Sequence, residues 1–66
     1  MNLDITKFKI AQARACLSID ELAEKSGIAR VSVSKILNGK RNATPKTIGL
    51  LAKALNVDVT EIIEQD

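Results

Sequence analysis

Apolar residues along this chain recur mostly at intervals of three and four, the spacing that gathers side chains on one face of an α-helix. Runs of β-branched residues are few, and the chain contains one proline. The helical pattern fits nearly the whole chain. The sequence therefore predicts an all-α fold.

Two helices are predicted in the N-terminal part. Asp4 is a good N-cap, and the helix that it starts is expected to cover residues 5–15. Ser18 and Glu21 have the spacing of a capping box, in which the serine oxygen accepts an amide proton and the glutamate reaches back to the serine N–H. A second helix is therefore expected over residues 19–26.

A sharp turn and a third helix should follow. Gly27 can adopt the positive φ that a turn directly after a helix requires. The third helix is expected over residues 29–37, where Asn38-Gly39 supplies the same kind of ending. Residues 18–37 thus have the pattern of two short helices joined by a glycine turn.

Two further helices are predicted beyond a polar loop at residues 40–43. Thr44 can cap a helix that begins at Pro45, where the missing N–H would have no partner in any case, and that ends at Leu55. A short fifth helix is expected from a second pair with capping-box spacing and the two isoleucines after it: Asp58, Glu61, Ile62 and Ile63.

The predicted third helix has two unlike faces. At 100° per residue, a group of apolar residues lies within about 60° of Val33 and should be buried: Ala29, Ile36 and Leu37. The opposite side is small, polar and basic except for one valine, and comprises Val31, Lys35 and Asn38, with Ser32 and Ser34 on the flanks and Arg30 at the edge. The outward face is therefore the candidate for a binding surface.

Charge along the chain is segregated, although the formal net charge is only +2. Residues 25–57 contain no acidic residue, whereas four acids crowd the C-terminal end: Asp58, Glu61, Glu64 and Asp66. A polyanion would be attracted to the basic centre and repelled by the acidic end. The distribution points to a nucleic acid as partner.

Length and composition restrict the number of domains and the classes of function that the chain can have. With 66 residues the chain is expected to form one domain, residues 1–66, near the size at which a single core suffices, and dimerisation fits that size. One cysteine and no histidine provide neither a disulfide framework nor a zinc or Cys/His catalytic set, so we expect no metal, no cofactor and no enzymatic activity. Without a membrane span or a secretory signal, a cytoplasmic protein is expected. No second domain for a small ligand is expected either.

The region from Leu17 to Gly39 resembles the Cro/CI-type (XRE-like) helix-turn-helix of phage repressors and bacterial regulators. The matching positions are Leu17-Ser18, Glu21-Leu22-Ala23, Gly27, Val33 and Ile36-Leu37-Asn38-Gly39. Further matches to the family's fourth helix and its exit are Thr44-Pro45, Leu51-Ala52-Lys53-Ala54-Leu55 and Val57. The resemblance covers about residues 7–63 and implies a compact five-helix, lambda-repressor-like domain.

The resemblance also implies that the third helix enters the major groove of double-stranded DNA. By position, the base-reading residues would be Arg30, Val31 and Lys35, with the arginine suited to guanine and the valine to a thymine methyl group. Residues expected to contact phosphates are Ser18, Ser32, Ser34, Asn38, Lys40 and Arg41. Ile19 departs from the family, since it stands where glutamine is common and cannot hydrogen-bond a phosphate.

These interpretations leave alternatives open. Val31 could pack on a neighbouring helix or a second subunit, and Lys40-Arg41 could be a solvated loop. Ile62 and Ile63 could cap the core, or one of them could join a dimer interface. The function expected first is a sequence-specific DNA-binding transcriptional regulator, a repressor acting as a homodimer. The alternative is an antitoxin-like or adaptor module that binds a protein partner through its acidic end.

Overall fold

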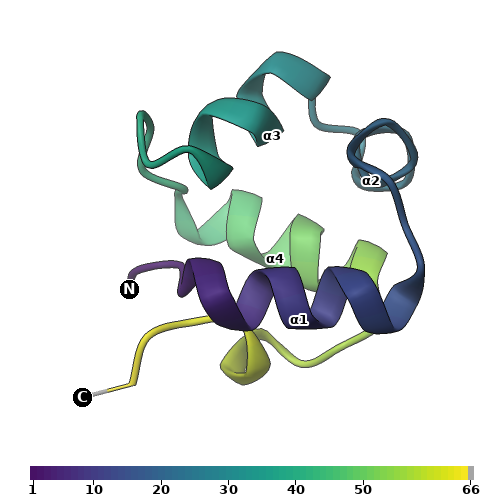
Figure 1. The fold of residues 1–66 in the computed structure, drawn as a ribbon. Coiled ribbons are helices and arrows are strands. Elements are labelled where there is room, and N and C mark those ends of the chain that lie inside the picture. Colours follow the sequence, from purple (N-terminus) through teal and green to yellow (C-terminus); the bar gives the residue numbers. More distant parts are fainter. Residues whose placement is uncertain (66) are drawn as a thin grey trace.

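The computed structural model describes residues 1–65 and contains four α-helices and one short 3-10 helix. The helices are α1 (Ile5–Ala15), α2 (Ile19–Ser26), α3 (Arg30–Leu37) and α4 (Pro45–Leu55), followed by η1 (Val59–Glu61). In Figure 1, α4 lies between the pair formed by α2 and α3 and the layer formed by α1 and η1. Asp66 of the acidic end lies outside the described residues.

The predicted helix ends are confirmed where local side chains cap the backbone. The Asp4 carboxylate accepts a hydrogen bond from the Lys7 N–H at 3.0 Å and starts α1. The Thr44 hydroxyl accepts one from the Thr47 N–H at 3.2 Å and starts α4. These bonds satisfy amides that have no partner within their helices.

The core gathers apolar side chains from all four helices and from the C-terminal segment. Its largest fully buried side chains are Phe8, Leu22, Val33, Ile48, Leu51 and Ile62. Helix α4 packs against α2, α1 and η1, so it connects the α2–α3 unit with the rest of the domain. The side of α3 that carries Val33 is thereby fixed toward the interior.

The prediction of a fifth α-helix is wrong. The expected capping box is present, with the Glu61 carboxylate accepting from the Asp58 N–H at 3.1 Å, but it starts only the three-residue η1. The backbone then pairs with the N-terminal segment: the Asp4 N–H donates to the Ile62 carbonyl at 2.9 Å, and Leu3 and Ile63 form an antiparallel bridge. These long-range bonds replace the bonds that a longer helix would have needed.

None of the helices in residues 1–65 combines the length and the apolar character that crossing a bilayer requires.

Candidate nucleic-acid interface

The angle between α2 and α3 depends on a turn at Gly27 and on one buried hydroxyl. Gly27 adopts the left-handed conformation with φ of 76°, and its N–H donates to the Ala23 carbonyl at 3.0 Å. The Ser26 hydroxyl donates to that carbonyl at 3.3 Å and accepts from the Ile28 N–H at 3.2 Å. Sequence reasoning missed Ser26, whose position directly before the helix-ending glycine was the available signal.

Helix α2 begins with the predicted capping box. The Glu21 N–H donates to the Ser18 hydroxyl at 3.1 Å, and the Ser18 N–H donates to the Glu21 carboxylate at 3.0 Å. Two hydrogen bonds with Ser18 lower the pKa of Glu21. The bond with the Ser18 backbone has the larger effect and the bond with its side chain the smaller. The ionised Glu21 carboxylate already accepts from the Ser18 N–H. A phosphate bound at the start of α2 would therefore depend on the Ser18 hydroxyl and on other amides of the first turn.

Helix α3 presents the two faces that the sequence predicts, with one correction. Val33 and Ile36 are buried and Leu37 is half-buried, whereas Val31 is 62% exposed. Ala29 was expected on the buried side, but it is exposed at the N-cap, because α3 begins one residue later than predicted. Among the described residues, no side chain caps this end of α3.

The three predicted base-reading residues all lie on the exposed surface of α3. Arg30 is its first residue, Val31 follows, and Lys35 lies one turn further on. The exposure of Val31 rules out its packing on another helix of the same chain. The three side chains are therefore accessible to a ligand that approaches α3 from outside.

Arg30 is held by a residue that sequence reasoning missed. Its Nε forms an ion pair with the carboxylate of Asp20, in the first turn of α2. The two positions are ten residues apart and meet only because the turn at Gly27 brings α2 and α3 together. No pattern in the sequence singled out Asp20 from the other acids.

The predicted phosphate-contacting residues are distributed along the start of α2, along α3 and in the following loop. Four are exposed and two half-buried, the latter being Ser32 and Ser34. The structure brings two of the six together: Arg41 Nη1 donates to the Ser32 hydroxyl at 2.9 Å. The Lys40 N–H donates to the Lys35 carbonyl at 2.9 Å, which holds the loop against the end of α3. The cationic loop thus continues the surface of α3.

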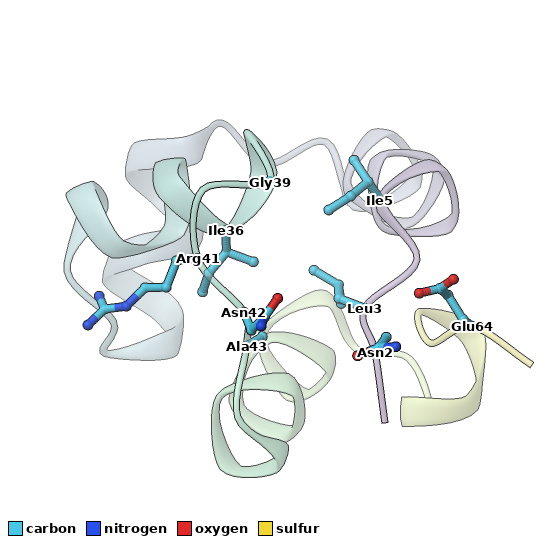
Figure 2. A pocket seen from close by; sticks show the side chains of 9 residues that line it. All are labelled: Asn2, Leu3, Ile5, Ile36, Gly39, Arg41, Asn42, Ala43 and Glu64. Atoms are coloured by element: carbon cyan, nitrogen blue, oxygen red, sulfur yellow. The ribbon is translucent and has the colours of Figure 1, made fainter.

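A hollow of about 450 Å³ lies beside this loop, between it and the N-terminal segment. Figure 2 shows Leu3 and Ile36 directed toward each other across it, with Asn42 nearby. The side chain of Arg41 runs away from the hollow, in agreement with its bond to Ser32. The hollow is therefore separate from the exposed face of α3.

Comparison with known proteins gives consistent matches. A family model described as helix-turn-helix matches residues 10–62. The control protein C.SmaI of Serratia marcescens is 40% identical over 47 residues, which is 71% of this chain and 56% of that protein. The chain thus spans a little over half the length of this relative.

Among solved structures, the restriction-modification controller protein C.AhdI from Aeromonas hydrophila has a TM-score of 0.80 with this chain and 30% sequence identity, over 86% of each chain. The family match includes both helices around Gly27 and extends through α4. The chain belongs to the Cro/CI-type (XRE-type) helix-turn-helix family of transcriptional regulators.

Proposed function

We propose that this protein is a sequence-specific DNA-binding transcriptional regulator, a repressor that acts as a homodimer and places α3 in the major groove of double-stranded DNA. The whole of residues 1–66 would serve as one helix-turn-helix domain. Since the proposed target is double-stranded DNA, we also propose that the protein acts in the cytoplasm.

The observation that carries this proposal is the outward face of α3. It offers one guanidinium, one ammonium and one apolar side chain, all exposed, on a helix whose other side is anchored in the core. The major groove is about 12 Å wide and admits one α-helix. Residues 25–57, which include α3 and the loop after it, contain no acid, which favours the approach of this helix to the phosphates. The carboxylate that lies beside this face belongs to Asp20 of α2, and it is paired with Arg30.

Different side chains would have different duties in the complex. Arg30 would donate two hydrogen bonds to guanine, Lys35 would donate to similar acceptors, and Val31 would touch a thymine methyl group. The cationic and hydroxyl groups around them would hold phosphates and fix the orientation of the domain. The paired Arg41 and Ser32 form one ready donor group of this kind, since arginine retains further N–H groups.

A homodimer would read two copies of the same short sequence. Two-fold symmetric proteins of this kind bind half-sites about 10 base pairs apart, one turn of the duplex. One relative is named a control protein and the other a restriction-modification controller protein, which supports a regulatory role for the complex. Repression is its simplest form, because a protein bound over a promoter excludes the polymerase.

The test is selection of bound duplexes from a random-sequence library, followed by footprinting and by binding measurements at several salt concentrations. A consensus with two related half-sites is expected, and log K should fall with log salt at a slope near −0.9 per phosphate neutralised. Failure to enrich any sequence, or affinity independent of salt, would refute the proposal.

The second candidate is a protein-interaction module on the same fold. The observation in its favour is the exposed acidic group Asp58, Glu61 and Glu64 on one end of the domain, opposite in charge to the α3 surface. Capture of one stoichiometric protein partner without retention of DNA at low salt would favour it. Capture together with DNA binding would instead identify a regulatory partner.

A further inference from the structure

The ion pair between Arg30 and Asp20 joins the recognition helix to the helix before it. The partners are Nε of the guanidinium and Oδ1 of the carboxylate. Both side chains remain largely exposed, at 65% and 73%. An exposed arginine normally samples many rotamers, and an ion-pair partner on a second helix favours those in which the guanidinium lies beside that carboxylate.

The atom that Asp20 contacts decides which hydrogen bonds remain. A guanidinium carries five N–H donors in a planar fork. Asp20 takes the edge that contains Nε, which leaves the edge formed by the two terminal nitrogens pointing away from the carboxylate. That remaining edge carries the parallel pair of donors needed for O6 and N7 of guanine.

We propose that Asp20 is a specificity-determining positioning residue, whose carboxylate orients Arg30 for bidentate donation to guanine. This inference rests on the function proposed above and deepens it. The carboxylate also offsets part of the attraction that Arg30 would exert on any phosphate. Asp20 thus favours the guanine contact over indiscriminate binding to the DNA backbone.

One competing role has the same location. A carboxylate can accept a hydrogen bond directly from N4 of cytosine. In that case Asp20 would read its own base pair, and its effect would not depend on Arg30. A comparison of the two single variants with the double variant therefore distinguishes the two roles. If Asp20 orients Arg30, its effect on base preference depends on Arg30; if Asp20 reads a base itself, its effect does not.

The variants to compare are Asp20→Asn, Arg30→Ala and the double variant. Glu24→Gln is the matched control, because Glu24 is an exposed acid of the same helix and forms no ion pair within residues 1–65. Asp20→Asn and Glu24→Gln each remove one negative charge from α2. Thermal unfolding of every variant verifies that the domain is folded.

The probe is the duplex that the wild-type protein selects from a random-sequence library. The base pair read by Arg30 is the one at which Arg30→Ala loses its preference, and all four base pairs are tested there. We expect Asp20→Asn to lower the preference for guanine at that position about tenfold, within the range that one bidentate pair contributes. In the Arg30→Ala background the same change should have no effect on preference.

The control separates charge from position. Asp20→Asn and Glu24→Gln should raise the affinity for random duplex to a similar extent, but Glu24→Gln should leave the base preference intact. Asp20→Glu should restore part of the preference lost in Asp20→Asn, because it restores the carboxylate.

The inference is overturned if Asp20→Asn keeps the wild-type preference, if it changes preference equally in the Arg30→Ala background, or if it shifts preference at another base pair. Each of these results leaves the proposed function standing, since the wild-type protein still selects a consensus. A wild-type protein that selects none overturns both.

Discussion

Replacing Val31 by alanine should weaken DNA binding without weakening the fold. Val31 lies on α3 with 62% of its surface exposed, so alanine leaves no cavity in the core. Alanine also has the higher helix propensity, by up to about 0.5 kcal/mol. The free energy of unfolding should therefore stay constant or rise slightly.

The expected loss of affinity follows from the exposed fraction. Full burial of a valine side chain contributes about 1.5 to 3 kcal/mol, so the exposed 62% retains about 1 to 2 kcal/mol for a contact with DNA. A thymine methyl group covers part of that surface. Val31→Ala should then cost about 1 kcal/mol, or about fivefold in Kd.

The assay combines the variant with a change in the DNA. Fluorescence anisotropy is measured on the selected duplex and on duplexes in which one thymine at a time is replaced by deoxyuridine, which lacks the methyl group. Wild-type protein should lose about fourfold in affinity at the thymine that Val31 touches, since one buried methyl group contributes about 0.8 kcal/mol. Val31→Ala should be nearly insensitive to the same replacement.

Additive effects of the two changes at every thymine would refute this reasoning. A shift of the monomer–dimer equilibrium of Val31→Ala in analytical ultracentrifugation would also refute the reasoning, because that result would place Val31 in a contact between subunits.

Other substitutions test the remaining assignments. Arg30→Ala should cost about 1 to 3 kcal/mol at one base pair, whereas Lys40→Ala should weaken all duplexes alike and reduce the salt slope by about 1; identical profiles for the two variants would contradict the division of roles. Ile62→Val should lower the free energy of unfolding by about 0.5 to 1.5 kcal/mol in chemical denaturation, with a smaller effect for Ile63→Val, because only the former side chain is fully buried. The pKa of Glu21 is lowered in the folded state, so its contribution to stability is complete above its ordinary value of 4.5 and is lost as the pH falls through the folded value. Thermal unfolding against pH should show this decline, and Glu21→Gln should make it less steep; an unchanged slope in that variant would rule out the capping carboxylate as the cause.

Elements that depend on neighbours in the chain were predictable to within one residue. Ser18 and Glu21 start α2, Gly27 closes it, and Thr44 and Pro45 start α4 as expected. Caps, glycine turns and helical faces involve residues a few positions apart, so the sequence contains all the participants. Two helix ends, at Cys16 and Asn56, take the left-handed conformation that glycine usually provides, and of these two residue types only asparagine is a common substitute for glycine there.

The C-terminal segment shows where this reasoning fails. The same capping-box pattern that starts an eight-residue helix at Ser18 yields three helical residues at Asp58. Local chemistry specifies how a helix begins, but its length depends on what the following backbone can bond with. Here the N-terminal segment provides the partners, through the bond between the Asp4 N–H and the Ile62 carbonyl.

The sequence by itself determined the helical class, the family and the face of α3 that points outward, because periodicity and capping are local properties. Only the tertiary structure decided which side chains meet across elements: Asp20 with Arg30, and Arg41 with Ser32. Both pairs require the angle between α2 and α3 and the path of the loop after α3. Those depend on packing around the common core, which no local pattern encodes.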